Sequence, residues 1–228
     1  PGGPGNVIDV SAARHHSCAV RSDSTAWCWG YDYHGELGYG RASPETGSAV
    51  GQPWPVQVMV SAGVPLTGVT KIVATGYSTC ALLNTGEVRC FGYNGNSNLA
   101  DATGSVARSY ASLPVRAGET NAGSPGSPLT GVTELTGADR HYCARLNTNR
   151  VVCWGWGPYG QQGNGTTADN NGAVYVHNKD NGSCTAADQS GCLADIVEVS
   201  AGAWTTCARD TSGYAYCWGY NANYQLGN

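Results

Sequence analysis

The chain has few charged residues and no long apolar run. Asp, Glu, Lys and Arg make up 12% of its 228 residues, and the formal net charge is −4. No basic stripe is present that would neutralise phosphates, so nucleic acid is not an expected partner. No run approaches the roughly 18 apolar residues of a membrane span, and no signal peptide precedes the first strand. The start, Pro-Gly-Gly-Pro-Gly, lacks an initiator Met, and we expect a processed product or a piece of a longer chain.

The motifs of common enzyme and metal-site classes are also absent. The sequence holds no Gly-x-Ser-x-Gly elbow, no P-loop, no His-Glu-x-x-His and no Cys-x-x-Cys pair. No pair of carboxylates recurs at a spacing that would suggest glycoside chemistry. Two of the five histidines, His16 and His141, share one place in a repeat, which favours a structural role for them. The sequence therefore predicts no enzyme, no metal site and no cofactor.

The ten cysteines form the clearest pattern. Eight of them stand in pairs ten positions apart: Cys18 and Cys28, Cys80 and Cys90, Cys143 and Cys153, Cys207 and Cys217. If each pair belongs to a β-hairpin, turn-forming residues occupy the tips at 22–24, 84–86, 147–149 and 211–213, with Gly86, Asn149 and Gly213 where a positive φ is needed. The cysteines then face each other at non-hydrogen-bonded pairs, where a disulfide fits. We predict a cross-strand disulfide in every copy and an oxidising compartment: secreted, cell-surface or periplasmic.

An insert at 178–194 breaks the pattern and supplies Cys184 and Cys192, which we pair with each other. Amide and acidic residues over 169–182 offer oxygen ligands for calcium, but they lack the ligand ladder of an EF-hand, and a solvated turn is the favoured interpretation. Asn164 and Asn181 begin glycosylation sequons.

Alignment on the cysteines gives four repeats, with steps of 62, 63 and 64 residues. Each repeat begins with an apolar strand, continues with small residues suited to a crowded central axis, and then forms the hairpin. An aromatic-glycine pair and a polar, glycine-rich loop follow. Three connectors carry a short edge-like strand, at 55–58, 113–115 and 174–176.

This combination resembles the repeat of the regulator of chromosome condensation family, and the best copy is Trp218-Gly-Tyr-Asn-Ala-Asn-Tyr-Gln-Leu-Gly227. The resemblance implies an all-β fold, a β-propeller, in which the four repeats are blades of about 62 residues. The family forms seven-bladed rings, so we expect an open arc that is part of a longer chain or completes a ring with a neighbouring copy. After a leader at 1–6, the domain at 7–228 divides into repeats at 7–58, 59–116, 117–176 and 177–228.

Two sets of aromatic residues recur in the repeats. Trp29, Phe91, Trp154 and Trp218 end the hairpins, and packing between blades accounts for them. A second set follows a glycine at one loop position, where the rings either cover their own loops or form a binding arc on one face of the propeller: Tyr31, Tyr93, Trp156 and Tyr220.

These residues lead to three hypotheses about function. The first is an extracellular, non-enzymatic binding or assembly module that contacts a protein partner or a neighbouring copy through its loops. The second is a carbohydrate-binding propeller that stacks glycans on the aromatic arc. The third is a secreted enzyme inhibitor, since secreted propellers that inhibit β-lactamase are similar in fold.

Overall fold

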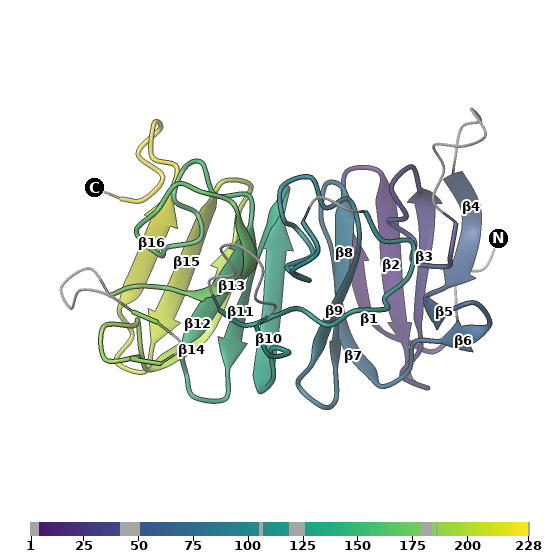
Figure 1. Cartoon of the computed structure of the whole chain (residues 1–228), viewed down its shortest axis with the longest axis horizontal. Coiled ribbons are helices and arrows are strands. Elements are labelled where there is room, and N and C mark those ends of the chain that lie inside the picture. The colour runs from purple at the N-terminus through teal and green to yellow at the C-terminus, as the bar shows by residue number, and fades with distance from the viewer. Residues whose placement is uncertain are drawn as a thin grey trace.

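The computed structural model describes residues 5–41, 51–104, 107–118, 126–178, 184–185 and 187–227. These residues form an all-β protein in which four antiparallel sheets of three or four strands stand side by side (Figure 1), with one further two-stranded sheet. We call the sheets blades 1 to 4 in chain order. Across the described residues, no helix is long and apolar enough to cross a membrane.

Each blade is built from consecutive strands. Blade 1 contains β1 (Val7–Ala12), β2 (His16–Arg21), β3 (Ala26–Tyr31) and β4 (Gly51–Gln57), and blade 2 contains β7 (Val69–Ala74), β8 (Ser78–Leu83) and β9 (Val88–Gly92). Blade 3 contains β10 (Val132–Ala138), β11 (His141–Leu146), β12 (Val151–Gly155) and β13 (Asn170–Tyr175). Blade 4 contains β14 (Ile196–Ala201), β15 (Thr205–Asp210) and β16 (Ala215–Gly219).

The hairpin tips have the conformation that the sequence predicts. The third tip residue has a positive φ in every blade: 60° at Ser24, 77° at Gly86, 56° at Asn149 and 88° at Gly213. The bond from Arg21 N to Thr25 O, 2.9 Å long, closes the first tip. Glycine and asparagine tolerate this left-handed conformation, which explains why three of the four tips use them.

All five predicted disulfides are present, and they pair all ten cysteines. In the four hairpins the bonded cysteines are also register partners across the two strands. Their Cα atoms lie 4.1 Å apart, the close approach of a non-hydrogen-bonded pair. Each of these disulfides therefore joins the second and third strands of a blade, counted from β1, β7, β10 or β14.

The blades form an open arc. The inner strands β1, β7, β10 and β14 contact one another in sequence order, and the first and last blades lie at opposite ends of the molecule (Figure 1). Apolar side chains fill the space between each blade and the next, which we call a blade seam. Each of the three seams has its own buried cluster, centred on residues such as Ile72, Leu135 and Ile196.

The connectors differ in part from the prediction. The expected strands at 55–58 and 174–176 fall in or beside β4 and β13, which are fourth strands of their blades. The strand expected at 113–115 is wrong, because that segment makes only an isolated bridge, between Pro114 and Arg89. Pro114 has no amide hydrogen to extend a ladder. A small hairpin, β5 (Met59–Ser61) with β6 (Val64–Pro65), lies between blades 1 and 2 and was not expected.

The hairpin disulfides are expected to stabilise the blades. Replacing both Cys80 and Cys90 with Ala should lower the free energy of unfolding by about 2–4 kcal/mol, because a short closed loop no longer restricts the unfolded chain. Urea unfolding measures the change. The control repeats both measurements with a reductant present, which opens the same loop in the wild type and should remove most of the difference between wild type and variant. A difference of the same size under reducing conditions would contradict the role assigned to the Cys80–Cys90 disulfide.

Candidate functional site

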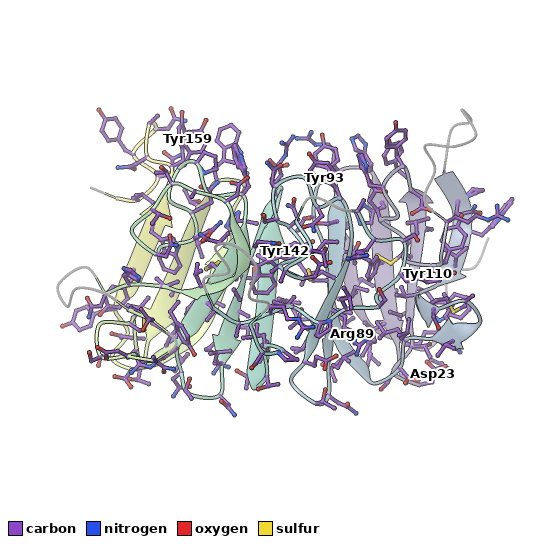
Figure 2. All side chains as sticks on the ribbon, viewed as in Figure 1. Asp23, Arg89, Tyr93, Tyr110, Tyr142 and Tyr159 are labelled. Atoms are coloured by element: carbon purple, nitrogen blue, oxygen red, sulfur yellow. A yellow bond between two sulfur atoms is a disulfide. The ribbon has the colours of Figure 1, made fainter. Side chains whose placement is uncertain are left out.

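The four aromatic residues singled out in the sequence lie at one end of the sheets, as the last residue of the third strand or the residue just after it. Figure 2 shows Tyr93 and Tyr159 along the upper edge of the molecule, whereas Asp23, at a hairpin tip, lies at the lower edge. Tyr31 is 39% exposed, and Tyr93, Trp156 and Tyr220 are half-buried. The rings are thus accessible in part, and each stands at the end of the third strand of its blade.

A glycine before each ring fixes its position. Gly30 has a φ of 108°, and a Cβ atom there would lie 2.6 Å from the His15 carbonyl oxygen. The amide of Tyr31 donates to the same oxygen at 2.9 Å. Trp156 and Tyr220 repeat this bond, to the carbonyls of Arg140 and Trp204. The glycine therefore lets the third strand turn closely past the start of the second strand.

A second set of side chains, which the sequence interpretation missed, lies beside these rings. It occupies the residue just before each second strand: His15, Tyr77, Arg140 and Trp204. All four carry large planar groups at one place in the repeat, and this shared property was the available signal. The loops add Tyr33, His34 and Tyr159.

Together these side chains form a continuous row, which we call the aromatic belt. Within and across blades 1 and 2, contacts run from His15 to Tyr31, Tyr33, His34, Tyr93 and Tyr77, with ring centroids 4.8–6.2 Å apart. Across blades 3 and 4, Trp156, Tyr159, Trp204 and Tyr220 contact one another at 4.7–5.9 Å. Tyr93 and Tyr220 thus contact a ring of the neighbouring blade, whereas Tyr31 and Trp156 contact rings of their own blade.

Arg140 joins the two halves of the belt. Its guanidinium lies 5.0 Å from the ring centre of Tyr77 and 5.9 Å from that of Trp156, within the range of a cation–π interaction. A hollow of about 200 Å³ opens there, lined by His34, Tyr77, Tyr93 and Arg140. The belt thus crosses all four blades with a cation near its middle.

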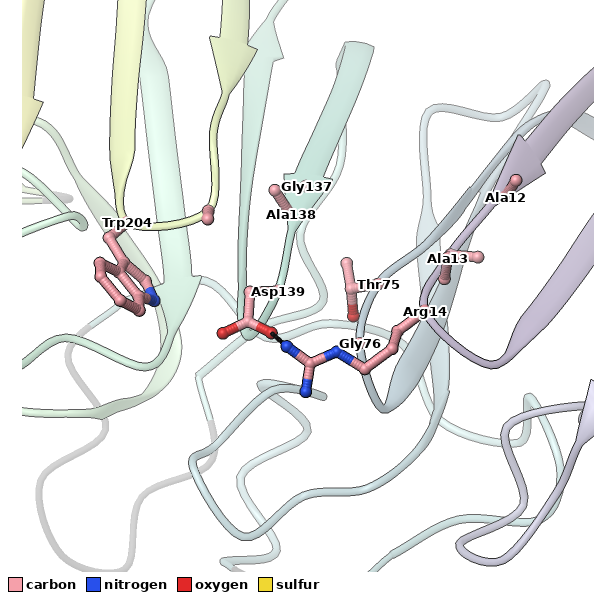
Figure 3. Close-up of a pocket in the computed structure, with 11 residues that line it drawn as sticks. Ala12, Ala13, Arg14, Thr75, Gly76, Gly137, Ala138, Asp139 and Trp204 are labelled. Atoms are coloured by element: carbon pink, nitrogen blue, oxygen red, sulfur yellow. Dashed lines mark ion pairs between the residues drawn. The ribbon is translucent and has the colours of Figure 1, made fainter. Parts of the chain in front are cut away.

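A larger hollow of about 350 Å³ lies at the inner rim of the blades (Figure 3). Small residues line most of it, as the sequence predicts for the central axis, including Ala12, Ala74 and Gly137. Arg14 reaches across it toward Asp139, with 3.9 Å between nitrogen and oxygen. Because Arg14 belongs to blade 1 and Asp139 to blade 3, this ion pair spans blade 2.

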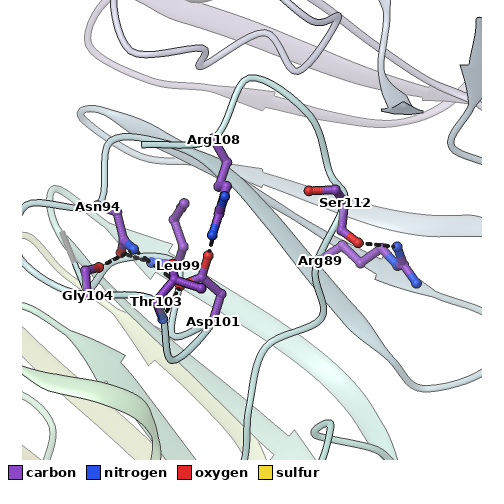
Figure 4. A network of polar contacts seen from close by, with 8 residues as sticks. All are labelled: Arg89, Asn94, Leu99, Asp101, Thr103, Gly104, Arg108 and Ser112. Atoms are coloured by element: carbon purple, nitrogen blue, oxygen red, sulfur yellow. Dashed lines mark hydrogen bonds and ion pairs between the residues drawn. The ribbon is translucent and has the colours of Figure 1, made fainter. Parts of the chain in front are cut away.

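Hydrogen bonds hold the loop of Tyr93 in place (Figure 4). Asn94 accepts from the amide of Leu99 at 3.0 Å and donates to Gly104 O and Asp101 Oδ1. Asp101 also accepts from Arg108 at 3.0 Å and from Thr103. This buried network makes the loop a rigid support for the ring.

The corresponding loop of blade 1 carries two carboxyl groups in place of amides. Asp32 stands where Asn94 and Asn221 stand in blades 2 and 4, and Glu36 corresponds to Asn98. Asp32 accepts from Leu37 N at 2.9 Å and Glu36 from His34 N at 2.7 Å. Both side chains are buried, and burial raises the pKa of each to about 7.

The second oxygen of each carboxyl group, Asp32 Oδ2 and Glu36 Oε1, has no hydrogen-bond partner among the described residues. In blade 2 the matching amide of Asn98 donates to Arg140 O of blade 3 at 2.6 Å. A protonated Glu36 carries an O–H group that can donate a hydrogen bond, as the Asn98 amide does, whereas a carboxylate can only accept one. The neutral acid therefore suits this site.

The two buried histidines have structural roles, as their repeat positions suggest. His16 Nε2 is 2.7 Å from Thr79 Oγ1, and His141 Nε2 is 2.9 Å from Thr206 Oγ1, each across a seam. Burial lowers the pKa of both imidazoles to about 4. They therefore stay neutral at physiological pH.

The other predicted features have mixed outcomes. Asn164 is buried and accepts from the Thr166 amide and hydroxyl, so it does not present an amide for a glycan. Asn181 and part of the 169–182 segment lie outside the described residues. Asp169 accepts from Gly157 N and Asn96, and Asn170 begins β13. Within the described part of the chain, no group of three or more His, Cys, Asp or Glu side chains could hold a metal.

Comparison with known protein families identifies the repeat. The sequence profile of the regulator of chromosome condensation (RCC1) repeat matches residues 7–36, 69–98, 137–161 and 196–225, just over half of the chain. Each match covers the first three strands of one blade or part of them, and the belt loop that follows.

Three similar proteins show how much of a relative this chain covers. The Homo sapiens probable E3 ubiquitin-protein ligase HERC6 is 29% identical over 181 residues, which are 76% of this chain and 15% of HERC6. The Arabidopsis thaliana ultraviolet-B receptor UVR8 is 27% identical over 226 residues, 96% of this chain and 42% of UVR8. Yeast RCC1 (Prp20), solved with Kap60 bound, has a TM-score of 0.71 at 13% identity over 100% of this chain and 47% of that one. The chain spans less than half the length of each relative.

The carboxyl pair of blade 1 should make stability depend on pH. Because the folded pKa values of Asp32 and Glu36, about 7, lie above the unfolded values, the folded state binds more protons between about pH 4 and 7. The contribution of these groups to the free energy of unfolding is therefore complete below about pH 4, and it is lost as pH rises through 7. The Asp32→Asn/Glu36→Gln variant should gain on the order of 2–4 kcal/mol at pH 8 and little at pH 4, measured by urea unfolding.

The reciprocal variant Asn94→Asp provides the control, because it places a carboxyl group in the equivalent buried position of blade 2. It should destabilise the protein more at pH 8 than at pH 5. An amide variant of blade 1 with the wild-type pH profile would show that these carboxyl groups do not titrate in the expected range.

Proposed function

Since this chain belongs to the regulator of chromosome condensation (RCC1) repeat family, we propose that it is an extracellular, non-enzymatic binding or assembly module that docks a protein partner on its aromatic belt. The supporting observation is the continuity of the belt across all four blades. Tyr31, Tyr93, Trp156 and Tyr220 are its repeated members, and side chains that differ from blade to blade fill the gaps between them.

The composition of the belt suits a protein partner. Tyr, Trp and Arg are the residues that most often carry the binding energy of protein interfaces. The residue before each second strand differs in the four blades, being His15, Tyr77, Arg140 and Trp204. A lectin with repeated sites would present four equivalent pockets, whereas this surface changes along its length and favours one extended partner.

The rigidity of the surface supports the same proposal. Three features hold the belt in one conformation before binding: the glycine turn before each repeated ring, the contacts between rings, and the hydrogen-bond network around Asn94. A partner then loses less free energy to the ordering of side chains. Another protein with this fold has a protein partner, since yeast RCC1 was solved with Kap60 bound.

The extracellular location is proposed from the cysteines. All ten cysteines are paired in disulfides. Among the described residues, no group of three or more His, Cys, Asp or Glu side chains could hold a metal. Disulfides persist in oxidising compartments and are rare in the cytosol. The absence of a catalytic constellation in the sequence motifs leads us to propose binding and not catalysis.

A pull-down with a belt variant tests the proposal. The immobilised wild-type chain is incubated with extracellular fluid from its source, and retained proteins are compared with those held by the Tyr31→Ala/Tyr93→Ala/Trp156→Ala/Tyr220→Ala variant. We expect one partner whose affinity falls at least thirtyfold in the variant, since a truncated interface aromatic commonly costs about 2 kcal/mol. The melting temperature should change little, because the rings lie outside the blade seams.

The matched control is Tyr214→Ala. Tyr214 is 68% exposed and follows the hairpin tip of blade 4, at the end of the sheets away from the belt. This variant should retain the partner fully. Equal retention by the belt variant would contradict the proposal, as would glycan-array binding at several weak, equivalent sites, which would support the lectin hypothesis. Collapse of folding in the belt variant would show that the rings are core residues.

A further inference from the structure

The guanidinium of Arg140 has no acidic partner among the described residues. Asp139, its neighbour in the sequence, pairs with Arg14 across the inner rim instead. The carbonyl oxygen of Arg140 accepts two hydrogen bonds, from Asn98 Nδ2 at 2.6 Å and from Trp156 N at 2.9 Å. The backbone is therefore fixed while the charge stays unpaired. Other arginines each form an ion pair with a carboxylate: Arg14, Arg21, Arg89, Arg108, Arg145 and Arg209.

Two aromatic rings hold the Arg140 guanidinium in the belt. The ring centre of Tyr77 lies 5.0 Å from it and that of Trp156 lies 5.9 Å from it. Cation–π contacts engage the positive charge but do not supply acceptors for the N–H groups. The side chain is half-buried, so an anion beside it would be attracted more strongly than at a fully exposed arginine.

The hollow of about 200 Å³ beside Arg140 provides the space for such an anion. Its other walls are Tyr77, Tyr93 and His34. Burial lowers the pKa of His34, so its imidazole is neutral at physiological pH and can donate one N–H without adding a charge. Arg14 steadies the Tyr77 wall, because its Nη1 donates to Tyr77 Oη at 3.3 Å. The hollow thus has aromatic walls and one cation.

No carboxylate of the described residues lines this hollow. The acidic side chains of the neighbouring loops have other contacts: Asp139 pairs with Arg14, and Asp169 accepts from Gly157 N and Asn96 Nδ2. A single guanidinium matches a single negative charge. A carboxylate carries that charge on two oxygens, which the N–H groups of arginine bind in pairs. A phosphate group carries more, about −1.5 to −2, and would require further cations.

We propose that Arg140 and this hollow form a subsite for the carboxylate of an acidic side chain, glutamate or aspartate, on the protein partner. The carboxylate oxygens accept from the guanidinium, and the methylene groups of the acidic side chain pack against Tyr77 and Tyr93. This inference rests on the proposed function and adds the kind of residue that the middle of the belt recognises. Rings around a central arginine exclude water from the ion pair, the setting in which arginine contributes most to an interface.

A small probe tests the subsite without the partner. N-acetylglutamate N-methylamide carries one carboxylate and no other charge. Titrated into the wild-type chain at neutral pH and constant ionic strength, it should shift the Arg140 Nε–H resonance in NMR spectra saturably, with a Kd on the order of 1 mM, as expected for a ligand of this size. The N-acetylglutamine N-methylamide control has nearly the same shape and should give no saturable shift.

Two substitutions separate the charge of Arg140 from its shape. Arg140→Gln removes the cation, and Arg140→Lys keeps the charge but loses the planar fork. Followed by the ring resonances of Tyr93, binding of the glutamate probe should weaken at least tenfold in Arg140→Gln and by a smaller factor in Arg140→Lys. The matched control is Arg209→Gln, which removes an arginine outside the hollow and should bind as the wild type does. If Arg140→Gln fails to fold, the wild-type titration and Arg140→Lys remain as tests.

Several results of the titration would overturn the subsite. One is equal binding of the glutamate and glutamine probes, or a shift that never saturates. Another is full binding of the glutamate probe by a folded Arg140→Gln variant. Tighter binding of inorganic phosphate or methyl sulfate than of the glutamate probe would show that the hollow is a site for a tetrahedral anion.

The pull-down distinguishes this inference from the proposed function. Affinity for the retained partner should fall at least tenfold in Arg140→Gln. If the four-ring belt variant loses the partner but Arg140→Gln keeps it fully, protein docking on the belt stands and the acidic subsite is wrong. If the glutamate probe binds at Arg140 but the wild-type chain retains no protein, the carboxylate site is supported and the protein-docking function is wrong.

Discussion

The structure depends on burial between neighbouring blades. A sheet of three or four strands in this chain cannot cover its own faces, and its apolar inner strand becomes buried only when the preceding blade packs against it. The exposed Val10 of blade 1 and its covered counterparts in the other blades show this dependence within one molecule. The hairpin disulfides stabilise each blade separately, because each connects two strands of the same sheet. Contacts between blades depend on the packing of side chains in the seams.

Much of the fold could be predicted from the sequence because its determinants are local. The ten-residue spacing of the cysteines, the turn residues between them and the glycine or asparagine at the third tip position all act within one hairpin. The repeat period then places the hairpins in successive blades. The same reasoning failed at 113–115, where a proline and an apolar neighbour suggested an edge strand, but the partner strand offers only a bridge.

The aromatic belt could be predicted only in part. The repeated glycine before Tyr31 and its counterparts marks a loop position, and that is a local signal. Whether His34 reaches Tyr93, or Arg140 reaches Tyr77, depends on the rotation and distance between blades, which no short sequence pattern encodes. The exchange of amides for Asp32 and Glu36 was visible in the sequence, but its consequence for pKa follows from burial, which required the structure.

The belt and the seams are coupled through adjacent residues. His15, Tyr77 and Arg140 each precede the residue that enters a seam: His16, Ser78 and His141. Trp204 precedes Thr205, which has the same position in blade 4. Successive residues of an extended chain point in opposite directions, so one side chain locks two blades together while its neighbour faces the binding surface. The seam residue is constrained by packing, whereas the belt residue can vary without loss of the fold. This arrangement explains how one repeat can hold the spacing of the belt constant while each blade contributes a different side chain to it.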